Sequence, residues 1–114
     1  MNNIAGAVGA TGLALMTAIC PQESAAEGFN GTEFLQRSAD RQRAYISTQL
    51  VMASSIAARI KPAMADCIGS AFFDGTGLSE TGFETSIERI REFNDYHPSS
   101  VLVVVIESQC GPFN

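Results

Sequence analysis

The strongest constraint on the fold is a stripe of apolar residues that recurs at helical spacing between positions 45 and 60. Its members lie at i, i+4, i+7, i+11 and i+14, and they are Ile46, Leu50, Ala53, Ala57 and Ile60. A second row would widen this buried face, and it consists of Tyr45, Gln49, Met52 and Ile56. Pro62 lacks an N–H and disfavours helical geometry at the residue before it. We therefore expect a core helix that breaks or kinks at Pro62 and restarts over 62–72.

Size and charge limit the function. A chain of 114 residues can build one small core but not two. Its 7 Lys and Arg residues against 12 Asp and Glu residues give a net charge of −5. Binding to nucleic acid or to an anionic membrane needs a basic surface, so this acidic balance argues against both.

Residues 1–26 have the composition of a secretory signal peptide. No charge occurs from Ile4 to Ile19, and Ser24-Ala25-Ala26 then provides a small-x-small cleavage site. The first three residues carry no basic charge, which signal peptides normally have, and the alternative is an N-terminal helix packed on the core. We predict cleavage after Ala26, export to the periplasm, no membrane association after cleavage, and a single helical domain over 27–114.

Cleavage would leave an even pair of cysteines, Cys67 and Cys110, in an oxidising compartment. A domain this small has a marginal core, and a bridge would stabilise it. We therefore predict a disulfide between these two residues; the alternative is that both stay reduced as small buried hydrophobes. Two cysteines and one histidine supply too few ligands for a metal site, and we expect no cofactor.

Other patterns predict further helices. Asn30 or Thr32 can cap a helix whose apolar positions begin at Phe34 and Leu35. Thr81 and Glu84 have capping-box spacing. The helix that they would begin should end near Tyr96 and His97, and its predicted buried face is Phe83, Ile87, Ile90 and Phe93.

The segment 101–106 has the composition of a buried strand, but no second strand is evident to pair with it. Pro98 and the hydroxyls of Ser99 and Ser100 favour a helix start, so we predict a fully buried helix running to Gln109. The predicted fold is all-α, a small bundle of four to five helices stapled by one disulfide.

No catalytic motif accompanies the single histidine, His97, and we interpret the chain as a non-enzyme. A histidine before a proline is more often a capping or loop residue than a catalyst. The candidate partner-binding residues lie in a turn-rich loop and at a helix corner, and they are Asp74, Thr76, Glu80, Tyr96 and His97.

The chain has one basic cluster, formed by Arg37, Arg41 and Arg43. It either contacts an acidic partner or forms a solvated helix face paired with Asp40 and nearby acids.

The order of several short motifs resembles the Rap/Tai family of small periplasmic immunity proteins, which neutralise type VI secretion amidase toxins. These motifs are Tyr45-Ile46, Cys67-Ile68, Ile87-x-x-Ile90-Arg91-x-Phe93-x-x-Tyr96-His97-Pro98 and an apolar run that closes at Cys110. The chain is similar, more loosely, to HdeA-type acid-stress chaperones, which are also exported, all-helical and single-disulfide proteins. The first resemblance implies a non-enzymatic inhibitor of a cell-wall amidase, and the second a periplasmic chaperone. A third hypothesis is a structural accessory homodimer that pairs through a small-residue helix face.

Overall fold

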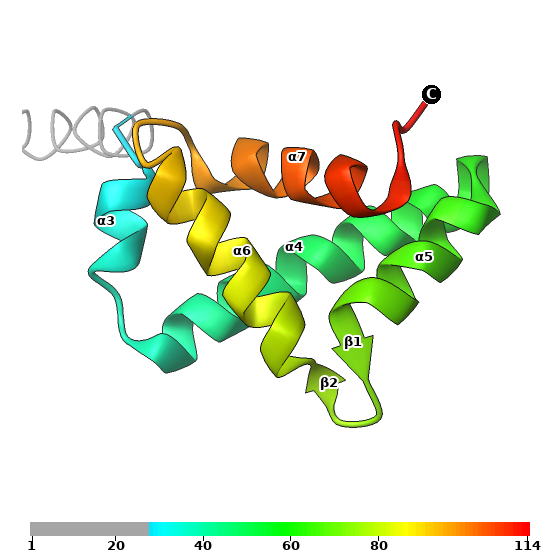
Figure 1. Cartoon of the computed structure of the whole chain (residues 1–114), viewed down its shortest axis with the longest axis horizontal. Coiled ribbons are helices and arrows are strands. Elements are labelled where there is room, and N and C mark those ends of the chain that lie inside the picture. The colour runs from blue at the N-terminus through cyan, green and yellow to red at the C-terminus, as the bar shows by residue number, and fades with distance from the viewer. Residues whose placement is uncertain (1–27) are drawn as a thin grey trace, which may run out of the picture.

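The computed structural model describes residues 28–114, so the predicted signal peptide lies outside the described residues. Within that range, five helices surround one core, and a short hairpin projects from them (Figure 1). The elements in chain order are α3 (Gly31–Leu35), α4 (Ala39–Ile60), α5 (Pro62–Phe72), β1 (Phe73–Asp74), β2 (Gly77–Leu78), α6 (Glu80–Glu92) and α7 (Pro98–Cys110). The prediction of an all-α bundle with four to five helices and one disulfide is confirmed.

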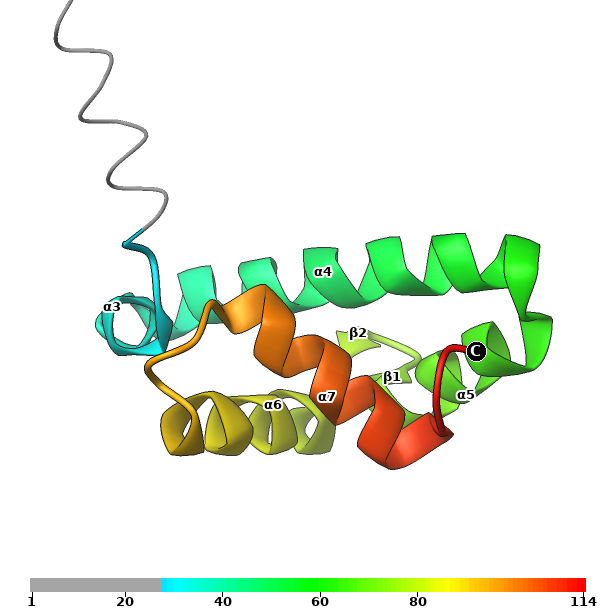
Figure 2. The same ribbon diagram turned by 90° about the horizontal axis from the view of Figure 1, so that it is seen from above.

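Helices α4 and α5 form a helical hairpin that breaks at the predicted proline. Ser38 caps α4 by accepting a hydrogen bond from the N–H of Arg41 at 3.3 Å. Lys61 leaves helical geometry, and Pro62 takes the first position of α5, where a missing N–H costs nothing. The chain then turns back, so α5 packs along the end of α4 (Figure 2).

The predicted buried stripe of α4 is confirmed as far as Ala57 and is wrong at Ile60. Ile46, Leu50 and Ala57 are fully buried, but Ile60 is 68% exposed. The second row is also exposed from Met52 onward. The reason is that α7 meets α4 only near its first half and then diverges toward α5 (Figure 2).

Helix α6 begins and ends earlier than its sequence predicts. Its cap is Ser79, which accepts a hydrogen bond from the N–H of Gly82, so the proposed Thr81–Glu84 capping box is wrong. Gly82 explains this placement: a Cβ there would lie 2.6 Å from the carbonyl oxygen of Phe72, so the first turn of α6 sits directly against α5.

The helix ends at Glu92 instead of near Tyr96 and His97. The carbonyl oxygens of Asn94 and Tyr96 accept hydrogen bonds from the N–H groups of Thr32 and Gly31, which dock α3 on this corner. These two carbonyl oxygens therefore bond to α3 and not to a further turn of α6. Of the two predicted caps of α3, Asn30 and Thr32, the structure uses Asn30.

The helix predicted over the apolar tail is confirmed as α7, with Pro98 in its first turn. It is not fully buried: Val103 and Val104 are exposed, because α7 lies on the outside of the bundle with one side against the other helices. Its last residue, Cys110, forms the predicted disulfide with Cys67 of α5. The bridge joins two helices that are 43 positions apart in the sequence.

Candidate protein-binding site

The candidate loop after Phe73 is a tight β-hairpin. Phe73 pairs with Leu78 and Asp74 with Gly77, which leaves Gly75 and Thr76 as the turn. Phe73 and Leu78 are half-buried and pack against the core, whereas residues 74–77 are exposed. Gly77 has φ +121°, a conformation that side-chain-bearing residues rarely adopt, and so the turn requires glycine there. The hairpin thus presents a small polar tip on an anchored base.

Hydrogen bonds within the turn hold the tip in shape. One carboxylate oxygen of Asp74, Oδ1, accepts from the hydroxyl of Thr76 at 2.7 Å and from its N–H at 2.8 Å. These two bonds hold the pKa of Asp74 below its usual value, and the bond from the Thr76 hydroxyl makes the larger contribution. Their contribution to stability is therefore present above the ordinary pKa of an aspartate and is lost as the pH falls through the lowered value.

Gly75 has no structural reason to be glycine within the described residues. Its φ is not in the left-handed region, and a Cβ added there would meet no atom within 4 Å. The bare backbone at the tip therefore leaves room for close approach by something outside the domain.

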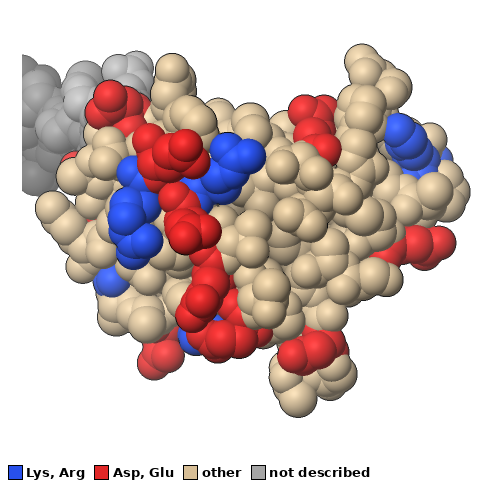
Figure 3. Space-filling model, viewed as in Figure 1, with Lys and Arg blue, Asp and Glu red and all other residues tan. Residues whose placement is uncertain are grey.

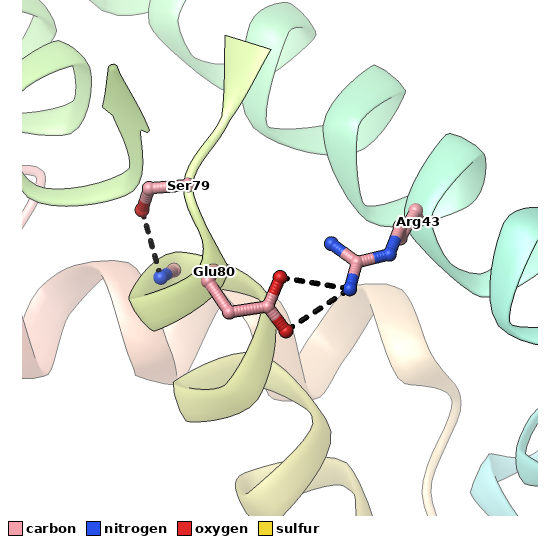
Figure 4. Close-up of polar contacts among 4 residues, drawn as sticks. Arg43, Ser79 and Glu80 are labelled. Atoms are coloured by element: carbon pink, nitrogen blue, oxygen red, sulfur yellow. Dashed lines mark hydrogen bonds and ion pairs between the residues drawn. The ribbon is translucent and has the colours of Figure 1, made fainter. Parts of the chain in front are cut away.

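Glu80 belongs to the scaffold of the hairpin. Both of its carboxylate oxygens accept hydrogen bonds from Nη2 of Arg43, at 2.9 and 3.0 Å (Figure 4). The guanidinium of Arg43 also stacks over the ring of Phe83, 4.0 Å from its centroid. This contact ties the start of α6 to α4. The predicted pairing of the basic cluster with nearby acids thus takes a different form, since Arg43 pairs with Glu80 and not with Asp40.

Tyr96 and His97 lie at the opposite end of α6 from the hairpin, separated by its 13 residues, or roughly 20 Å. The structure therefore does not bring the two sets of candidate residues together. His97 caps α7, because its Nδ1 accepts a hydrogen bond from the N–H of Ser99 at 3.1 Å. Its capping role agrees with the expectation for a histidine before proline.

Tyr96 is 61% exposed and borders a shallow apolar groove of about 240 Å³. The other residues lining this groove are Phe93, Ser100, Val101 and Val104. Charge lies elsewhere: the acidic side chains of α6 form a line across the molecule, whereas the surface over α7 carries few charges (Figure 3).

Over residues 28–114, no group of three or more His, Cys, Asp or Glu side chains is arranged to hold a metal ion. In the same range, no helix is both long enough and apolar enough to cross a membrane. Comparison of the chain with models of protein families, with curated proteins and with solved structures finds no match. The resemblance to the Rap/Tai family stays a prediction from short motifs.

Two features of the site were missed in the sequence. The spacing Asp74-Gly75-Thr76-Gly77 between Phe73 and Leu78 is typical of a tight hairpin, and that signal could have found the two short strands. The link between Arg43 and Glu80 joins residues 37 positions apart, and no local pattern could have revealed it.

Proposed function

We propose that this chain is an exported, non-enzymatic protein of the immunity type, which inhibits a cell-wall amidase by placing the Phe73–Leu78 hairpin in the active-site cleft of that enzyme. The observation that carries the proposal is the exposed tip of the hairpin, which is ordered by its own hydrogen bonds and anchored in the core at both strands. Ordering a mobile loop opposes binding, so a tip that is already ordered loses less free energy when it binds.

Both ends of the hairpin are attached to rigid elements. It follows α5 directly, and α5 is fixed to α7 by the disulfide. It precedes α6, whose first residue is held by Arg43. The disulfide also supports export, because such bridges persist in oxidising compartments.

The tip suits a narrow cleft. Gly75 adds no side chain, and Asp74 supplies one negative charge at the exposed tip. An amidase that uses a cysteine nucleophile beside a histidine offers hydrogen-bond donors and a cationic ring to such a carboxylate. We infer that Asp74 binds those donors and that the bare backbone of Gly75 allows it to reach them.

The test begins with the neighbouring genes, among which we expect a cell-wall amidase, and then titrates that amidase with both binding and peptidoglycan cleavage measured. We expect Gly75→Leu to weaken binding at least about 100-fold, because the added side chain blocks entry to the cleft. The matched control is Gly69→Leu on α5, where a Cβ also meets nothing within 4 Å and the position is exposed. We expect that control to bind and inhibit as the natural protein does.

Two outcomes would overturn the proposal. One is that the natural protein neither binds nor inhibits the amidase. The other is that Gly75→Leu binds as tightly as Gly69→Leu, which would place the contact somewhere other than the hairpin. Circular dichroism of both variants should match that of the natural protein, because both added side chains point into open space.

A further inference from the structure

Four glutamates form one row on α6, which we call the acidic row. They follow each other at intervals of four positions, all are exposed, and they are Glu80, Glu84, Glu88 and Glu92. Figure 3 shows acidic side chains in a line across this face of the molecule. Like charges at this spacing oppose helix formation, and negative charge favours a helix only near its N-terminus. The row therefore destabilises the later turns of α6.

Basic side chains of this chain neutralise the ends of the acidic row but not its middle. Arg43 pairs with Glu80, and Arg89 lies 3.7 Å from Glu92. Among residues 28–114, the two middle glutamates form no ion pair. Residues 1–27 contain no Lys, Arg or His, so they hold no basic side chain that could pair with them. The charge of the two middle glutamates therefore remains available to a cation from another molecule.

These two glutamates border a groove of about 530 Å³ between α6 and the start of α4. Phe83 and Ile87 also line the groove and are almost fully buried, so they form an apolar floor. Its charged residues are Glu84, Glu88 and Arg91, which leaves the lining negative. Lys and Arg side chains have apolar stems and charged heads. The groove therefore suits them, since the stems can pack on the floor while the heads reach the two carboxylates.

We propose that basic side chains beside the amidase's active-site cleft occupy this groove while the cleft holds the hairpin. This inference rests on the function proposed above. Only residues 74–77 of the hairpin are exposed, whereas a stable interface involves roughly 20 residues or more on each side. An amidase that holds the tip must therefore also contact the surface around it. Helix α6 begins two positions after β2, so Glu84 and Glu88 lie within roughly 15 Å of that strand.

The chemistry of the substrate indicates the charge of the partner. A cell-wall amidase acts on a polymer whose stem peptides carry free carboxylates. Basic side chains beside its cleft would attract that polymer, because a cleft lined by one sign of charge concentrates a substrate of the opposite sign. The acidic row presents carboxylates to the same side chains, so it competes with the substrate for them. The hairpin then fills the cleft, and the acidic row covers its basic border.

The test is the association rate constant of this chain with the amidase, measured by stopped-flow fluorescence at low and high salt. The Debye length is about 20 Å at about 20 mM salt and about 4 Å at about 500 mM salt. We expect the double variant Glu84→Gln/Glu88→Gln to lower the rate constant at least about fivefold at low salt and less than about twofold at high salt. The reason is that complementary charge at an exposed contact acts mainly on association.

The control is Glu33→Gln/Asp66→Asn, which removes the same charge from two exposed positions outside the groove. It should lower the rate constant less than about twofold at either salt concentration. Equal slowing by the two double variants would overturn the inference, because net charge alone would then steer association. A rate constant of the natural protein that does not change with salt would also overturn it.

Failure of this inference is distinguishable from failure of the proposed function. If the natural protein does not bind the amidase, both fail. If Gly75→Leu weakens binding while the glutamate variant associates as fast as the natural protein, the hairpin contact stands and this inference alone fails.

The melting temperature of the glutamate variant provides a second readout. It should not be lower than that of the natural protein, because the substitutions remove repulsion between like charges on α6. A lower melting temperature would mean that the two carboxylates stabilise the fold itself, and this result would also overturn the inference.

Discussion

Replacing both Cys67 and Cys110 with serine is expected to lower the free energy of unfolding by about 4 kcal/mol. The bridge closes a loop with a sequence separation of 43, and it restricts the unfolded chain far more than the folded one. The effect is large for this domain because a small core leaves little stability in reserve. Urea denaturation followed by circular dichroism measures it.

Reduction provides the control for this substitution. Dithiothreitol should destabilise the natural protein by a similar amount and leave the double-serine variant unchanged. If the natural protein is equally stable with and without reductant, the bridge does not restrict the unfolded chain and the chain-entropy argument fails.

Ile46→Ala should lower the free energy of unfolding by about 3 kcal/mol, whereas Ile60→Ala should change it by less than about 0.5 kcal/mol. Both residues are isoleucines of α4 and belong to the same predicted stripe, but Ile46 is fully buried and Ile60 is mostly exposed. Truncating Ile46 leaves a cavity among its neighbours. Truncating Ile60 removes little packing, and the better helix propensity of alanine offsets the loss.

Urea denaturation of the two variants, followed by circular dichroism, measures both values. Equal losses would mean that Ile60 is covered in the monomer, contrary to its exposure at the end of α4. A negligible loss for Ile46→Ala would mean that this position is not part of the core.

Local patterns predicted the helices well because each depends on neighbouring residues. Pro62 ends α4 and Pro98 begins α7 for reasons contained in the residues themselves. The position of the α6 cap could not be predicted in this way. Ser79 and Thr81 are both acceptable caps by residue type. The structure uses Ser79, and Gly82 then packs closely on Phe72, a tertiary contact that no local pattern reveals.

Burial was predicted less well than helix position. Periodicity assigns Ile46 and Ile60 to the same side of one helix, but only the path of α7 decides which of them is covered. The candidate site shows the same limit. Asp74 and Thr76 were correctly placed in an exposed turn, whereas Glu80 is held by an arginine distant in sequence and His97 by the helix that it caps.

The proposed function depends on export, because cell-wall amidases act outside the cytoplasm and because the disulfide requires an oxidising compartment. Intact mass of the protein recovered from the periplasm, with and without reductant and alkylation, tests this most directly. We predict the mass of a chain from Glu27 to Asn114, no alkylated thiol before reduction, and modification of Cys67 and Cys110 after it. A full-length mass with all three cysteines alkylated before reduction would contradict export and the bridge together.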